Sequence, residues 1–211
     1  MTTRSVLAAL LATLLTGCAA SGVGSGAIEL PADIPVSDGT PLPLARDYDA
    51  THYDLAITFD HEARTFEGES TLEAVSLVRK LDCIRVHAAP SLNVTSAAFV
   101  DTPDEALRIS RDGDVVTACS DTTLGRGEPF SVRFAFTGAP SARDHYGAFL
   151  VEPPDDRLPM LYTQFESQGA RRMFPLYDEP FDKATTRMTI TADARYALLS
   201  NGRRVAEEVD D

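Results

Sequence analysis

The sequence predicts an all-β domain, an antiparallel β-sandwich with a saddle-like sheet. Three segments in which apolar and polar residues alternate carry this prediction, at 53–60, 66–74 and 130–137. Such alternation is typical of strands with one face on a core. The Asp112-Gly113 pair lies between two strand-like runs and indicates a type I′ hairpin. No segment beyond the N-terminal leader has a sustained helical period, which leaves all-β as the fold class.

Shorter strands are expected between and after these three segments, and the sequence contains no internal repeat. One helical turn is expected near Phe181 to Ala184. Runs of four to eight apolar or β-branched residues bounded by turn residues indicate the strands. They lie at 81–87, 92–100, 106–111, 114–119, 146–151, 160–165, 185–192 and 196–200.

Residues 1–17 predict a secretory signal peptide. Arg4 supplies a basic charge, and an apolar run follows at 6–15. A membrane-spanning helix needs about 20 residues, so this run fits a signal-peptide core instead. The sequence L-T-G-C ending at Cys18 resembles a bacterial lipobox, in which the cysteine is lipidated and becomes the first mature residue. The alternative is an ordinary signal peptide with a chance cysteine.

Residues 18–45 are expected to form the lipidated cysteine and a flexible tether, since a Gly/Ser-rich and then Pro-rich segment cannot bury enough apolar surface to fold. Ala19 after the cysteine suggests, by resemblance to lipoproteins, an outer-membrane anchor facing the periplasm. The folded domain is expected at 46–211, which is long enough for one core. We expect this domain to be C-terminally incomplete.

The net charge of −13 is not offset by any run of basic residues, so nucleic acid is excluded as a partner. Two cysteines, Cys83 and Cys119, remain after Cys18. They lie in strand-like runs, and in an oxidising envelope they could pair as a disulfide. The alternative is two buried thiols. A zinc site from this pair alone is not expected, because structural zinc needs four ligands.

Gln164 and Glu166 are the candidate binding residues. Alternate residues of a strand share a face, so a strand at 160–165 would point both side chains the same way. A carboxylate there could meet the α-ammonium group of a peptide, which is largely protonated at neutral pH. From spacing alone, Glu166 could equally be a solvated residue at the end of a strand.

The run from Tyr162 to Lys183, Y-T-Q-F-E-S-Q-G-A-R-R-M-F-P-L-Y-D-E-P-F-D-K, closely resembles the substrate-binding loop of zinc-dependent aminopeptidases of the aminopeptidase N type. Weaker matches occur in the same order as in that family's N-terminal β-domain. They are Tyr53-x-Leu55 with Asp60, Phe66-x-Gly68, Ile84-x-Val86-His87 and Ser200-Asn201-Gly202. The resemblance implies that Glu166 binds the peptide amine and Gln164 lines the pocket for the first side chain.

The same resemblance implies that the charged residues and prolines of this run shape the loop rather than react. Arg171 paired with an acid such as Asp178 would hold Glu166 in place, and two prolines would fix the turn. The residues with this expected role are Arg171, Pro175, Asp178, Glu179, Pro180 and Lys183.

No catalytic residue and no metal ligand is expected in this chain. The four histidines are His52, His61, His87 and His145. A zincin needs two histidines four positions apart with a glutamate between them. His61-Glu62 begins such a pattern, but Thr65 stands where the second histidine is required.

The resemblance therefore implies the substrate-binding, cleft-covering N-terminal domain of a zinc aminopeptidase that removes N-terminal residues from peptides. The zinc would belong to a catalytic domain of the same protein beyond Asp211, and this 211-residue chain alone would be inactive. The partners implied are peptide N-termini, that catalytic domain, and the bacterial membrane through Cys18. The alternatives are a non-catalytic β-sandwich binding or assembly module, and a lipoprotein with an accidental loop match.

Overall fold

The computed structural model describes residues 44–141, 146–155 and 157–209, and the backbone of residues 3–9. Nearly all regular structure in these residues is β. The strands are β1 (Thr3–Ala9), β2 (Tyr48–Asp60), β3 (Thr65–Ser76), β4 (Leu81–His87), β5 (Asn93–Phe99), β6 (Arg108–Asp112), β7 (Val115–Leu124), β8 (Pro129–Gly138), β9 (Gly147–Val151), β10 (Met160–Gln164), β11 (Thr185–Asp193) and β12 (Arg203–Val209). A single 3-10 turn, η1 (Ala170–Arg172), is the helical element of the described chain.

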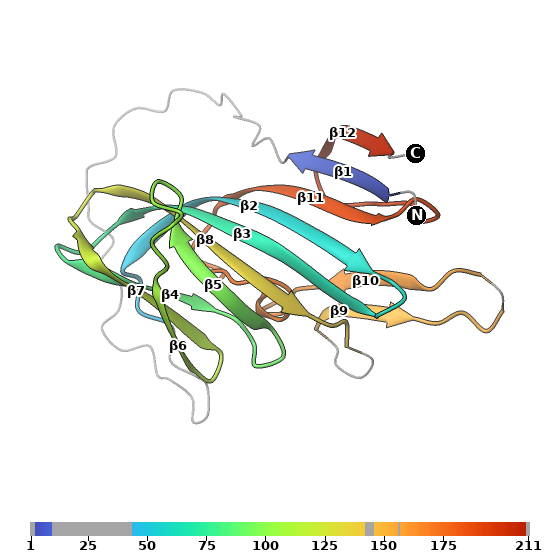
Figure 1. Ribbon diagram of the computed structural model, residues 1–211, viewed down its shortest axis with the longest axis horizontal. Helices are drawn as coiled ribbons and strands as arrows, with labels where there is room; N and C mark the ends of the chain where they lie inside the picture. Colours follow the sequence, from blue (N-terminus) through green and yellow to red (C-terminus); the bar gives the residue numbers. More distant parts are fainter. Residues whose placement is uncertain (1–2, 10–43, 142–145, 156, 210–211) are drawn as a thin grey trace, which may run out of the picture.

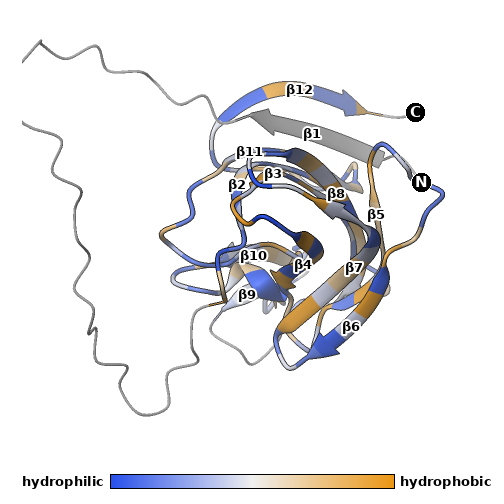
Figure 2. Cartoon of the chain, turned by 90° about the vertical axis from the view of Figure 1, so that its left-hand side faces the viewer, coloured by the Kyte–Doolittle hydropathy of each residue, from blue (hydrophilic) through white to orange (hydrophobic). Residues whose placement is uncertain are grey.

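The described strands form one large and two small sheets (Figure 1). The large sheet has the order β12-β1-β11-β2-β3-β8-β5, and the small sheets are β4-β7-β6 and β10-β9. In Figure 2 the large sheet arches over the two smaller ones, and the core lies between them. The all-β sandwich predicted from the sequence is confirmed.

The long hairpin of β2 and β3 forms the centre of the large sheet. Alternate residues of β2, namely Tyr53, Leu55 and Ile57, are buried, as their period-2 pattern predicts. Opposite them Gly68 has a steric role, because a Cβ at this position would lie 2.2 Å from the Ala56 carbonyl oxygen. The Phe66-x-Gly68 pattern therefore has a packing reason.

Two features of the large sheet differ from the sequence-based expectation. Strand β11 runs parallel to β2, so the sheet is mixed rather than purely antiparallel. Strand β1, inside the predicted signal peptide, pairs antiparallel with β11 and β12. A short apolar run is ambiguous in sequence, because its periodicity does not separate a strand from a leader core.

The predicted hairpin at Asp112 is present with a different turn. Asp112 pairs with Val115, so the central turn residues are Gly113 and Asp114. Only Gly113 of these has a positive φ, at 54°. A positive φ at the first central position alone fits type II′ rather than the predicted type I′.

Two smaller predictions near the C-terminus are wrong. Residues 181–184 are not helical, and the helical turn lies instead at η1. Residues 196–200 are not a strand, whereas β12 at Arg203–Val209 was not predicted. Its seven residues are all exposed, so β12 lacks the one-sided apolar pattern by which strands are found.

No helix in the described residues is long and apolar enough to cross a membrane. The lipobox cysteine, Cys18, and the predicted tether up to residue 43 lie outside the described residues. The signal peptide, tether and domain limits therefore stay predictions.

Candidate functional site

The candidate site begins at the end of a two-stranded hairpin. Strand β10 pairs antiparallel with β9, and its last residue, Gln164, lies opposite Gly147. Glu166 follows at the start of a turn over 166–169 that leads into η1. The strand ends one residue earlier than predicted, so Glu166 is held by a turn rather than by strand geometry.

Gln164 and Glu166 are both exposed. In the part of the chain that the structure describes, neither side chain has a hydrogen bond or ion pair, and neither lines the two cavities described below. A carboxylate in this state keeps its charge available for an incoming cation. The binding roles of these two residues stay predictions.

The segment that follows is tied to the core by hydrogen bonds between distant parts of the chain. The Tyr177 backbone N–H donates to the Tyr53 hydroxyl at 2.9 Å, and the Ser70 hydroxyl donates to the Pro175 carbonyl at 2.9 Å. The Tyr177 hydroxyl in turn donates to the Leu44 carbonyl at 2.6 Å. Burial makes unpaired polar groups costly, so each bond restricts the path of the loop.

His87, at the end of β4, is a second point at which the loop is attached to the core, after the bonds of Pro175 and Tyr177. Its backbone N–H donates to the Leu176 carbonyl at 2.7 Å, and the Leu176 N–H returns a bond of 3.1 Å. The His87 Nδ1 accepts the Asp178 N–H at 3.1 Å, and Nε2 lies 3.5 Å from a Glu179 carboxylate oxygen. Burial, aided by the Arg171 charge, lowers the pKa of His87 to about 4. The ring is therefore neutral at pH 7, with Nδ1 as the acceptor.

Arg171 and Asp178 form the third attachment. The Arg171 Nε lies 2.9 Å from the Asp178 carboxylate, and Nη2 donates to the Asp178 carbonyl at 3.1 Å. Both side chains are nearly buried, at 12% and 9% exposure. The sequence predicted this pair, and the structure contains it. A buried charge pair with additional backbone hydrogen bonds holds one geometry.

Asp182 is a fourth attachment, which was not predicted from the sequence. Its carboxylate is fully buried, accepts two bonds from Arg46 at 3.1 and 2.5 Å, and accepts the Ala50 N–H at 3.3 Å. Arg46 and Asp182 are 136 positions apart, so no local pattern links them.

The other predicted loop residues divide into buried and exposed positions. Pro175 and Glu179 are buried, and Glu179 accepts a bond of 3.4 Å from Gln168, two positions after Glu166. Pro180 and Lys183 are exposed, and Lys183 has no polar partner among the described residues. Glu179 thus connects the buried loop to the exposed turn, whereas Lys183 does not.

A cavity of about 280 Å³ lies beside the loop, lined in part by Gln168, Arg171 and Asp114. Its charged groups largely pair among themselves, since an Arg171 nitrogen lies 3.6 Å from the Asp114 carboxylate in addition to the Asp178 bond. This cavity therefore lies next to the turn of Glu166, and the charge of Arg171 in its lining is balanced by carboxylates.

The described residues do not fit a zinc site. They contain no group of three metal-ligating side chains. The histidines have separate surroundings: His52 Nδ1 contacts the Thr185 hydroxyl at 2.7 Å, His61 stacks on Tyr196 with centroids 3.6 Å apart, and His87 binds the loop. His145 lies outside the described residues.

The two strand cysteines lie in the small sheet of β4, β7 and β6, outside the loop itself. Cys83 on β4 and Cys119 on β7 are opposite each other in the small sheet and joined by a disulfide. Of the two possibilities left open by the sequence, the structure contains the disulfide. It links two neighbouring strands and contributes no ligand to the site.

The sequence of this chain matches that of a known protein family. The model of the peptidase M1 N-terminal domain matches residues 49–211. A puromycin-sensitive aminopeptidase of Caenorhabditis elegans is 29% identical over 74% of the chain, which spans 17% of that relative. Aminopeptidase M1-B of Oryza sativa subsp. japonica is 30% identical over 74% of the chain, which spans 18% of that relative.

Solved structures support the fold. A crystal structure of an M1 zinc metallopeptidase variant from Deinococcus radiodurans has a TM-score of 0.57 and 23% identity, covering 70% of this chain and 33% of that one. A second structure, described as bound to a Tyr-Ser-Ala substrate, has a TM-score of 0.54. The chain thus spans about a third of these structures and under a fifth of the two curated relatives.

Proposed function

The chain belongs to the peptidase M1 N-terminal domain family, and from this membership we propose that it forms the amine-binding side of a zinc aminopeptidase active site. Glu166 binds the α-ammonium group of a peptide, and Gln164 contacts the first side chain. The zinc and the water-activating residues belong to a separate catalytic domain. One observation carries the proposal: an exposed carboxylate, without a polar partner among the described residues, follows a hairpin whose next residues are fixed by buried contacts.

The physical basis is charge recognition at a preorganised point. Hydrogen bonds that involve a charged group contribute about 1.5–3 kcal/mol. The Glu179 contact to Gln168 and the Arg171–Asp178 pair restrict the turn that holds Glu166. A turn whose backbone is already restricted loses less entropy on binding than a flexible one, which favours recognition of a single cationic chain end.

Exposed apolar side chains on the same hairpin support docking of the catalytic domain there. Val151, Met160 and Tyr162 are 41%, 58% and 45% exposed, and Leu158 in the connecting turn is 42% exposed. Apolar side chains that gather on a protein surface mark an interaction site. A partner domain on this face would cover them and enclose the space beside Glu166.

The decisive kinetic test uses the protein in which this domain is joined to its zinc domain. We expect Glu166→Gln to lower kcat/KM for aminoacyl substrates by more than tenfold, as loss of about 1.5–3 kcal/mol requires. The matched control is Lys80→Gln, outside the loop, which changes an exposed charge that has no polar partner among the described residues. Unchanged kinetics in Glu166→Gln would remove the assigned role.

Sequencing the coding DNA beyond codon 211 separates the proposal from its alternative. An open frame that continues into His-Glu-x-x-His supports the aminopeptidase. A stop codon at that point favours the non-catalytic binding module.

The proposed location is the bacterial envelope, with a lipid anchor on Cys18. The motif L-T-G-C and the linker that follows support it. We expect metabolic labelling with a fatty acid to mark the wild-type protein and not Cys18→Ala. Equal labelling of both would contradict the anchor.

A further inference from the structure

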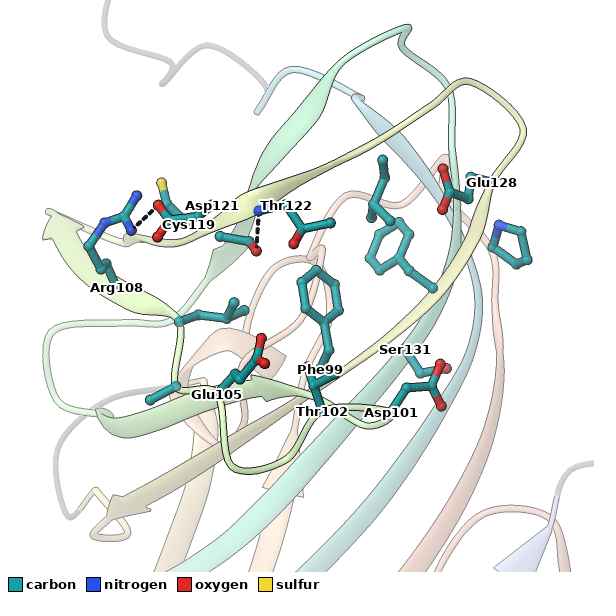
Figure 3. A pocket seen from close by; sticks show the side chains of 16 residues that line it. Phe99, Asp101, Thr102, Glu105, Arg108, Cys119, Asp121, Thr122, Glu128 and Ser131 are labelled. Carbon is teal, nitrogen blue, oxygen red and sulfur yellow. Dashed lines mark hydrogen bonds and ion pairs between the residues drawn. The ribbon is translucent and has the colours of Figure 1, made fainter.

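A second cavity, of about 490 Å³, lies away from the loop of Glu166. It opens between the small sheet, at the end of β7, and the edge of the large sheet, where β5 ends and β8 begins (Figure 3). Its volume is within the range of small-molecule sites, which is about 300–1,000 Å³. No part of the β9–β10 hairpin lines it.

The base of this cavity is apolar and aromatic. Phe130, Leu107 and Leu124 are buried, and the Phe99 ring extends into the middle of the cavity in Figure 3. Tyr48 packs edge-on against Phe130, with ring centroids 5.8 Å apart, which holds that ring against the core. Such a base suits the apolar body of a ligand.

The rim of the cavity is acidic. Asp101, Glu105, Asp121 and Glu128 line it, and Arg108 is the basic residue of the lining. Four carboxylates against one guanidinium leave a formal charge of −3. Arg108 is already paired with Asp121 at 2.6 Å. The carboxylates of Asp101 and Glu105 have no polar partner among the described residues, so they stay available to a ligand.

The walls are preformed by backbone hydrogen bonds. The Leu107 N–H donates to the Ala97 carbonyl at 2.8 Å, and the Val100 N–H donates to the Ser131 carbonyl at 2.9 Å. The Glu128 carboxylate also closes its own turn by accepting the Gly125 N–H at 2.7 Å. A ligand would therefore not have to pay for ordering these walls.

We propose that this cavity binds a small amphipathic organic cation, with its apolar part on Phe99 and Phe130 and its ammonium group at the acidic rim. The charge of the rim disfavours anions. A bare metal ion is disfavoured as well, because the described residues hold no cluster of three ligating side chains. An ammonium near aromatic faces gains cation–π attraction in addition to the carboxylates.

The test is an NMR titration of the chain with phenethylamine, using 2-phenylethanol as the uncharged comparator. We expect saturable shifts of amides at 99–108 and 119–131 with the amine, at least fivefold weaker binding of the alcohol, and weaker amine binding in 0.5 M salt than in 0.05 M salt. Equal binding of the two compounds would overturn the proposal.

Variants locate the site. The double variant Asp101→Asn, Glu105→Gln should weaken amine binding at least fivefold, and Thr102→Phe should block the cavity. A charge-matched control, Glu67→Gln with Glu73→Gln on β3, should bind as the wild type does. Glu166→Gln should also leave this binding unchanged.

Shifts confined to 164–168 and lost in Glu166→Gln would overturn the cavity proposal while supporting the proposed amine site. If Glu166→Gln left the aminopeptidase kinetics unchanged, the proposed function would fail, but amine binding in the cavity would not be affected.

Discussion

The segment from Gln164 to Asp182 has two contrasting halves. In the second half, Asp178 and Asp182 are buried and bonded to groups on Arg171, His87 and Arg46. In the first half, Gln164 and Glu166 are exposed and without polar partners in the described chain. The residues of the second half thus stabilise the domain itself, whereas those of the first half are available to bind a ligand or another domain.

The contrast has an energetic meaning. A buried carboxylate without a partner costs several kcal/mol, so each acid in the second half needs its specific bond. An exposed carboxylate costs the fold little, and nothing in the described residues uses it. Mutations should therefore divide into those that unfold the domain and those that affect only recognition.

The largest predicted effect is on the buried pair. Asp178→Ala removes the closer acid from Arg171 and leaves a nearly buried guanidinium with only the longer, 3.6 Å contact to Asp114. We expect the free energy of unfolding to fall by about 3 kcal/mol, the lower end for one-sided loss of a buried pair. Urea unfolding followed by circular dichroism measures it.

Arg133→Gln on β8 is the matched control for that variant. Arg133 lies 3.6 Å from Glu69, and both side chains are about half exposed. Exposed pairs contribute less than about 1 kcal/mol, so little change is expected. Equal loss in both variants would erase the distinction between the halves.

The pH dependence of stability should show the buried half as well. Burial holds the pKa of His87 at about 4, whereas in the unfolded chain it lies near 6.5. Between these values the unfolded state binds more protons, so stability rises with pH. The contribution is complete above pH 6.5 and is lost as the pH falls toward 4, by up to about 3 kcal/mol.

Unfolding free energies between pH 4 and 7 check this in the wild type and in His87→Gln. The two share every carboxylate, so the difference between their slopes belongs to His87. Identical slopes would contradict a neutral His87, and an NMR titration of its ring in the wild type provides the pKa directly.

A smaller effect is predicted for the hydroxyl that holds the loop backbone. Tyr53→Phe leaves the Tyr177 N–H without its buried acceptor. We expect a loss of about 1–2 kcal/mol, typical of one unsatisfied buried group. Tyr162→Phe is the control, because Tyr162 is 45% exposed, its ring stacks on Phe149, and its hydroxyl has no hydrogen bond to the residues that the structure describes. A loss of the same size in Tyr162→Phe would count against the role of burial.

The sequence allowed the strands and the Arg171–Asp178 pair to be predicted better than the other attachments of the loop. Alternation in β2, β3 and β8 follows from one-sided burial, which leaves a local pattern. The Arg171–Asp178 pair joins residues seven apart within one recognisable run. The bonds of Asp182 to Arg46 and of Tyr177 to Tyr53 join positions 136 and 124 apart, and such pairs leave no periodic trace. The exposed β12 and the parallel placement of β11 escaped prediction because both depend on tertiary pairing.

The smallest predicted effect on stability is that of Glu166→Gln, and it tests most directly whether the two halves of the segment differ. Glu166→Gln keeps the size of an exposed side chain that has no polar partner in the described residues, so the free energy of unfolding should change by less than about 0.5 kcal/mol. Urea unfolding of the variant beside Asp178→Ala measures the difference. A loss near that of Asp178→Ala would mean that Glu166 belongs to the framework of the loop. An unchanged stability together with a tenfold kinetic loss would mean that the domain carries a charge it does not need for folding, which is the behaviour expected of a binding residue.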